Sequence, residues 1–129
     1  MVPRRSSSSF NWLLRKSAAA GKKTVIATIS SSWGSIALTQ GANGRNTIGY
    51  NMSKAAANMA TKTMAGEWKG NGITVVSFCP GWVATDMGTS AATVTVEEST
   101  AALVSSILDK VDIKHTGGFY DRNFQTIAW

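Results

Sequence analysis

Tyr50 and Lys54 are the residues whose types and spacing point most directly to chemistry. They stand four residues apart at the start of a predicted helix, so their side chains should share one face of it. A free tyrosine has a pKa near 10, whereas an ammonium about 5 Å away stabilises the phenolate by roughly 3 kcal/mol at an effective dielectric constant of about 20. The pair is therefore suited to proton transfer at neutral pH, although this spacing alone also occurs by chance on exposed helices.

Two loops that flank this helix in the sequence carry further small and polar residues. The loop before it reads Ser30-Ser31-Ser32-Trp33-Gly34-Ser35-Ile36, and the loop after it reads Cys79-Pro80-Gly81-Trp82-Val83-Ala84-Thr85-Asp86-Met87-Gly88. Each loop follows a short segment rich in β-branched residues. In open α/β sheets, ligands bind at the carboxyl ends of the strands, so we expect both loops and Tyr50 to meet in one cleft.

The two β-branched segments, Thr24–Ile29 and Ile73–Phe78, are predicted to be strands. Their apolar residues do not alternate cleanly with polar ones. That pattern is typical of parallel strands covered by helices on both faces. The tail of the chain contains two shorter strand candidates, Gly118–Asp121 and Thr126–Trp129.

Three helices are predicted between and before these strands. Phe10–Ser17 has apolar residues at helical spacing, and Tyr50–Lys69 ends at a glycine pair around Asn71. Thr95 and Glu98 have the spacing of a capping box, which predicts a helix over about Val96–Asp109. The alternation of helices and strands favours a parallel α/β sheet. Residues 1–9 are interpreted as a flexible leader and residues 10–129 as one domain.

The order of these motifs resembles the short-chain dehydrogenase/reductase family. Its active-site helix is similar to Tyr50-x-x-Ser53-Lys54-Ala55-Ala56, and its nicotinamide-side loop is similar to Pro80-Gly81-x-Val83-x-Thr85. The serine loop and the Cys-Pro-Gly-Trp-Val form resemble its carbonyl-reductase-like or C-factor-like branch. The resemblance runs from about Trp12 to Trp129 and covers about half of a usual family member. It implies the C-terminal part of a Rossmann-type, doubly wound parallel sheet, truncated on its N-terminal side.

The resemblance also implies a role for each matching residue. Tyr50 would exchange a proton with the substrate oxygen, and Lys54 would favour the tyrosinate and bind the nicotinamide ribose. Ser31 would hold the substrate oxygen, with Ser30 and Ser32 as alternatives. The cofactor-binding residues would be Tyr50, Lys54, Pro80, Gly81, Val83 and Thr85. The implied function is an NAD(P)-dependent oxidoreductase acting on a carbonyl or an alcohol.

The sequence departs from the family pattern where the dinucleotide phosphates would bind. It contains neither TGxxxGxG nor NNAG, and such glycines let backbone N–H groups approach a pyrophosphate. Asn11 is too close to the first strand to take the role of the family's active-site asparagine. The cofactor could be NADP or NAD, and the 129 residues alone are not expected to bind it well. The alternative function is a non-catalytic remnant acting as an interaction or regulatory protein.

Composition limits the other possibilities. Residues 1–66 contain nine Lys or Arg and no acidic residue, but the basic residues are scattered, so neither nucleic acid nor a membrane is an expected partner. One cysteine, Cys79, excludes an intrachain disulfide, and the carboxylates show no metal-ligand spacing. His115 is expected at the surface. A cytoplasmic location is favoured, with a mitochondrial one as a weak alternative because residues 1–24 are rich in Ser, Arg and Lys.

Self-association is a further expectation. In the family's strand order, Thr24–Ile29 would have an open edge in this chain, and open edges invite pairing with another chain. The resemblance implies a second possible contact, because the family uses the helix that matches Tyr50–Lys69 for dimer contacts. The expected partners are therefore a small-molecule substrate and further copies of the chain.

Overall fold

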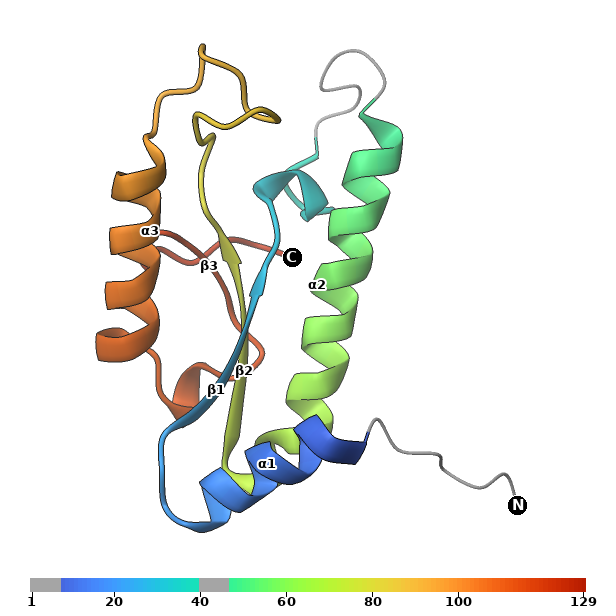
Figure 1. Cartoon of the computed structure of the whole chain (residues 1–129). Coiled ribbons are helices and arrows are strands. Elements are labelled where there is room, and N and C mark those ends of the chain that lie inside the picture. Colours follow the sequence, from blue (N-terminus) through green and yellow to red (C-terminus); the bar gives the residue numbers. More distant parts are fainter. Residues whose placement is uncertain (1–7, 40–46) are drawn as a thin grey trace.

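Three parallel strands form the centre of the computed structural model, which describes residues 8–39 and 47–129 (Figure 1). They are β1 (Thr24–Ile29), β2 (Ile73–Cys79) and β3 (Phe119–Asp121), in the order β1-β2-β3. Both pairs of neighbouring strands are parallel. This confirms the α/β class and the parallel arrangement predicted from the sequence.

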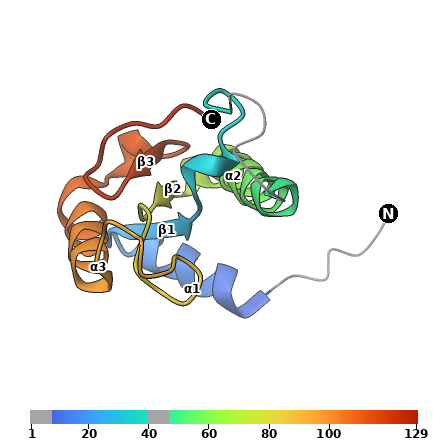
Figure 2. The same cartoon turned by 90° about the horizontal axis from the view of Figure 1, so that it is seen from above.

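Helices cover both faces of this sheet. Helix α2 (Ile48–Trp68) lies on one face and α3 (Val96–Ser105) on the other, while α1 (Ser8–Ala19) crosses the end at which β1 and β2 begin (Figures 1 and 2). Strand β2 is buried along its whole length. A central strand with a helix on each side buries both of its faces, which explains why its sequence lacks alternation.

The core consists of two hydrophobic clusters, one on each face of β2. On the α3 side, Val76 and Phe78 pack with Val111 and Tyr120. Leu103 of α3 and Ile107, two residues beyond the end of α3, cover them. On the α2 side, Ile73 and Val75 pack with Ala65 of α2. The residues packed around them come from α1, β1 and α2: Leu14, Ala18, Ile26, Met64 and Trp68. The sheet is thus held between two apolar layers, which fixes the ends of β1 and β2 relative to α2.

Helix α3 begins at the predicted capping box. The Thr95 hydroxyl accepts from the Glu98 N–H at 3.1 Å, and a Glu98 carboxylate oxygen accepts from the Thr95 N–H at 2.9 Å. The hydrogen bond that the Thr95 N–H donates to the carboxylate, followed by the contribution of the Thr95 side chain, holds the pKa of Glu98 below its usual value. The helix then continues into a π-helical turn over Ser106–Lys110, so the helical stretch reaches one residue beyond the predicted end.

The other predicted bounds differ by small amounts, with one exception. Helix α1 extends two residues beyond Phe10–Ser17 at each end. Thr126–Trp129 forms no strand: Thr126 makes an isolated antiparallel bridge to Tyr120. The Asp121 carboxylate accepts from the N–H groups of Asn123 and Gln125 in the turn between them. The pairing with β3 ends after this one bridge, and the Trp129 carbonyl accepts instead from the Ala37 N–H in the loop after β1. Residues 1–7 of the predicted leader lie outside the described residues.

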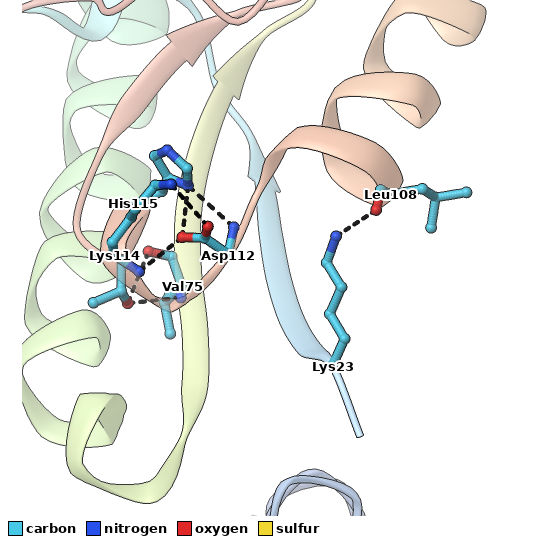
Figure 3. Close-up of polar contacts among 7 residues, drawn as sticks. Lys23, Val75, Leu108, Asp112, Lys114 and His115 are labelled. Carbon is cyan, nitrogen blue, oxygen red and sulfur yellow. Dashed lines mark hydrogen bonds and ion pairs between the residues drawn. The ribbon is translucent and has the colours of Figure 1, made fainter. Parts of the chain in front are cut away.

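His115 is not the surface residue that the sequence suggested. Its side chain is only 19% exposed, and its ring packs edge-on against Phe124 and Tyr120. Its Nδ1 lies 3.1 Å from the Asp112 nitrogen (Figure 3). Burial, and secondarily the Asp112 charge, raise the pKa of Tyr120. None of these four residues, Asp112, His115, Tyr120 and Phe124, lines the cavity described below.

The described helices include none that is both long and apolar enough to cross a membrane.

Candidate active site

A cavity of about 1000 Å³ opens at the carboxyl ends of β1 and β2. Ile29 and Cys79, the last residues of these strands, form part of its wall. Every site residue named from the sequence lines this cavity: Ser31, Tyr50, Lys54, Pro80, Gly81, Val83 and Thr85. The strands and α2 therefore bring together residues that lie more than fifty positions apart in the chain.

The first turns of α2 carry Tyr50 and Lys54 into the cavity. The Lys54 Nζ lies 5.7 Å from the centre of the Tyr50 ring, and it donates to the Ile29 carbonyl at 3.2 Å. The Ser53 hydroxyl donates to the Tyr50 carbonyl at 2.7 Å. The ammonium thus lies over the face of the Tyr50 ring and is tied to the end of β1.

All three serines after β1 line the cavity, and Ser30 and Ser31 differ in their hydrogen bonds. Ser30 is buried, and its hydroxyl donates to the Lys54 carbonyl at 3.2 Å. The Ser31 hydroxyl accepts from the Trp33 N–H at 3.2 Å and thereby caps the short 3-10 turn Ser32–Gly34, labelled η1. A hydroxyl has one donor and two acceptor positions. The Ser31 proton is therefore still available to a ligand, whereas that of Ser30 is used within the fold.

Gly34 allows the serine loop to lie directly on α2. A Cβ at this position would stand 2.6 Å from the Lys54 carbonyl carbon and 2.8 Å from the Lys54 Cβ. Real Cβ atoms do not approach other heavy atoms so closely. The glycine in the serine loop thus places η1 against the turn of α2 that carries the candidate catalytic lysine.

The loop after β2 is closed by its own hydrogen bonds. The Trp82 indole N–H donates to the Gly88 carbonyl at 2.7 Å, and the Gly88 N–H donates to the Thr85 hydroxyl at 3.1 Å. Val83 forms a parallel bridge with Val94. Gly81 has a φ of +87°, a conformation that favours glycine. These contacts hold Val83 and Thr85 at the rim of the cavity.

The remaining wall of the cavity is largely apolar. Trp33 packs edge-on against Tyr50, with ring centres 5.9 Å apart. Trp82 and Met87 line the loop side, and Val96 and Leu103 contribute from α3. The α3 residues were not among those named from the sequence. Their spacing is consistent with one side of a helix, but the sequence does not show that this side lies over the carboxyl end of β2.

Residues 11–110 match the family model for the short chain dehydrogenases. The chain belongs to the short-chain dehydrogenase family. It is also 34% identical to the C-signal protein of Myxococcus xanthus over 105 residues, an alignment that covers 81% of this chain and 60% of that protein.

Solved structures of the family have the same arrangement of elements. The carbonyl reductase Sniffer of D. melanogaster has 36% sequence identity and a TM-score of 0.82, over 92% of this chain and 49% of that one. The NADPH-bound carbonyl reductase from chicken fatty liver has 33% identity and a TM-score of 0.83, over 95% of this chain and 51% of that one. The chain thus spans about half the length of these family members.

Proposed function

We propose that this chain carries the proton-transfer half of an NAD(P)-dependent oxidoreductase site that acts on a carbonyl or an alcohol. The observation that supports it is the convergence of Tyr50, Lys54 and the serine loop on one cavity. The match to the short-chain dehydrogenase family and the likeness to carbonyl reductases agree with oxidoreductase chemistry.

In the reductive direction, the Tyr50 hydroxyl gives its proton to the substrate oxygen, and in the oxidative direction the phenolate takes it back. Lys54 stabilises the phenolate that this transfer leaves behind. The Ser31 hydroxyl donates a hydrogen bond to the substrate oxygen while it accepts from the Trp33 N–H. The aromatic and aliphatic side chains around the cavity exclude water from the reacting groups.

A nicotinamide dinucleotide fits the donor groups of this cavity. When bound, it supplies or accepts the hydride. Lys54 would hold the nicotinamide ribose, while Val83 and Thr85 would contact the carboxamide, with Pro80 and Gly81 shaping the same loop. The chicken carbonyl reductase of similar fold is described with NADPH bound. The phosphate-binding glycine motif is absent from the 129 residues. The proposed contacts in this chain are therefore to the nicotinamide and its ribose, and not to the phosphates.

The proposal is tested by joining this chain to the half of the chicken carbonyl reductase that it does not match. We expect the fusion to bind NADPH and to reduce aldehydes or ketones. Tyr50→Phe in the fusion should lower kcat by about 10²–10⁴-fold, because general acid catalysis contributes that much, and should leave NADPH affinity nearly unchanged. Loss of NADPH absorbance gives the rate.

A matched control is Ser53→Ala, which removes a hydroxyl from the same helical turn outside the cavity wall. It should leave the fusion's turnover within a few fold of the parent's. If the fusion binds NADPH and turns over equally well with Tyr50→Phe, the proton-donor role is wrong.

A non-catalytic role is the second candidate, and one contact favours it. The Lys54 Nζ donates a hydrogen bond to the Ile29 carbonyl. One of its three N–H donors is therefore used within the fold rather than for a ribose. A folded fusion that binds NADPH but reduces none of a broad panel of carbonyl compounds would favour this second function.

A further inference from the structure

Two tryptophans form part of the wall of the cavity that holds Tyr50. Trp33 and Trp82 both line this cavity, and they remain 43% and 53% exposed. Large aromatic side chains that stay partly open in a cavity wall are typical of ligand contacts, because a bound apolar group removes their surface from water. The two indole rings therefore mark the apolar part of the candidate active site.

Trp33 is held directly beside the candidate proton donor. It lies in η1, which begins at the Ser31 cap, and Gly34 places this turn against α2. The Trp33 and Tyr50 rings meet edge to face, with their centres 5.9 Å apart. A ring attached directly to a carbonyl that binds Tyr50 and Ser31 can therefore contact the Trp33 indole.

Trp82 reaches the cavity from the loop after β2, at the same end of the sheet as η1 (Figure 1). Its indole N–H donates to the Gly88 carbonyl at 2.7 Å, which fixes the orientation of the ring. A side chain that is already held in place loses less rotamer freedom when a ligand binds. Met87 also lines this side of the cavity, and its flexible thioether can adapt to the shape of a ring.

The described part of the cavity wall offers no partner for a positively charged substrate. Lys54 is the one charged residue among those that line it, and its Nζ donates to the Ile29 carbonyl. Asp86 stands between Thr85 and Met87 in the sequence, but it does not line the cavity with them. Burying a charge without a counter-ion is unfavourable. The site therefore favours a neutral substrate with an apolar body.

We propose that this site prefers neutral ketones and aldehydes with an aromatic ring on the carbonyl carbon, and that Trp33 determines this preference. The inference rests on the proposed function and adds a substrate class to it. The carbonyl oxygen binds the hydroxyls of Tyr50 and Ser31, and the ring packs against the Trp33 indole. An aromatic pair contributes a factor of about 2–10 in affinity beyond the burial of its area.

The nicotinamide ring is the competing occupant of an aromatic wall. Its proposed contacts, Val83 and Thr85, belong to the loop after β2, whereas Trp33 lies in η1 beside Tyr50. Trp82 precedes Val83 in the sequence and is in a position to serve either ring. Trp33 is therefore the residue that distinguishes the two occupants. Its loss should change the preference among ketones and leave the affinity for NADPH nearly unchanged.

The experiment compares acetophenone with cyclohexyl methyl ketone, which share one carbon and oxygen skeleton and differ in whether the ring is aromatic. In the fusion with the chicken carbonyl reductase half, Trp33→Leu should lower the ratio of kcat/KM for acetophenone to kcat/KM for cyclohexyl methyl ketone by about 2–10-fold. The intrinsic reactivities of the ketones cancel, because parent and variant are measured with the same pair. A shared effect of the substitution on Tyr50 cancels for the same reason.

Trp12→Leu is the matched control, because it makes the same substitution at an exposed tryptophan of α1 that does not line the cavity. It should leave the ratio unchanged. Three results would overturn the inference: an unchanged ratio in Trp33→Leu, an equal fall in Trp12→Leu, or a loss of NADPH affinity in Trp33→Leu without a change in the ratio.

Binding to the 129-residue chain separates this inference from the proposed function. Magnetic resonance of the indole N–H groups follows the binding, and Trp33→Leu identifies the Trp33 signal by its loss. We expect acetophenone to shift this signal and to bind the parent chain more tightly than cyclohexyl methyl ketone does. If it does so while a folded fusion transfers no hydride, the aromatic preference is supported and the proposed function is wrong. Equal affinity for the two ketones, or an unshifted Trp33 signal at millimolar acetophenone, would overturn the inference.

Discussion

At the scale of single residues, the site depends on a few close contacts around Lys54. Its backbone touches Gly34, its carbonyl accepts from Ser30, and its ammonium binds the Ile29 carbonyl. One residue thus joins the end of β1, the serine loop and α2, through its backbone and its side chain together. The contacts also distinguish two serines of the loop. The Ser30 hydroxyl donates its proton to the Lys54 carbonyl, whereas the Ser31 hydroxyl accepts from the Trp33 N–H and its proton is available to a ligand in the cavity.

Gly34→Ala tests how tightly this arrangement is packed. The new methyl would overlap the backbone of Lys54, and overpacking typically costs about 1–3 kcal/mol. We therefore expect a lower free energy of unfolding, measured by urea titration. In the fusion protein the displaced serine loop should also lower kcat.

Gly66→Ala serves as the control for this substitution, because Gly66 is in α2 and no heavy atom lies within 4 Å of its added Cβ. It should raise the free energy of unfolding by about 0.5–1 kcal/mol, since alanine is the better helix former. The packing argument fails if the two substitutions shift stability in the same direction.

At the scale of elements, α3 is the helix whose start is determined most locally. The reciprocal bonds between Thr95 and Glu98 satisfy two N–H groups that have no partner in the helix. The helix then places Val96 and Leu103 in the cavity wall and holds the rest of its inner side on the sheet. The cap therefore supports both the core and the site.

Thr95→Ala should lower the free energy of unfolding by about 1 kcal/mol, the usual cost of losing a side-chain cap. Thermal unfolding followed by circular dichroism measures it. Thr100→Ala is the comparison on the same helix, because its hydroxyl bonds only the Val96 carbonyl of its own turn. If Thr100→Ala is as destabilising as Thr95→Ala, the effect is not due to the cap.

At the scale of the whole molecule, the residues proposed to contact a nicotinamide dinucleotide gather in one cavity. Lys54, Val83 and Thr85 all line it, and the proposed position of the nicotinamide and its ribose is beside them. The 129 residues contain no glycine-rich phosphate motif. Backbone N–H groups of a glycine-rich loop at a helix N-terminus are a common binding site for the phosphates of such a cofactor.

We therefore expect the 129-residue chain by itself neither to bind NADPH or NADH with useful affinity nor to transfer hydride. Titration calorimetry with each nucleotide measures the first, and nucleotide absorbance with a carbonyl substrate measures the second. A well-behaved chain that binds either nucleotide at micromolar affinity would show that the residues present are sufficient for a minimal enzyme.

The sequence alone determined the features that depend on neighbours along the chain. The β-branched segments Thr24–Ile29 and Ile73–Phe78, the i, i+4 pair of Tyr50 and Lys54, and the capping box at Thr95 all follow from local rules of propensity and periodicity. They were sufficient to predict a parallel α/β fold. The site residues in the two loops were named from the family resemblance, and the α3 residues of the cavity wall were not named.

Only the tertiary structure decided which groups meet across long separations. Nothing local to His115 indicates that Phe124 and Tyr120 cover it, and the strand expected at Thr126–Trp129 is reduced to one bridge between Thr126 and Tyr120. The contact of Lys54 with Ile29 and the apolar wall from α3 likewise join residues far apart in the chain. The physical reason is that such contacts depend on how whole helices pack on the sheet, which the pattern of any one segment does not contain.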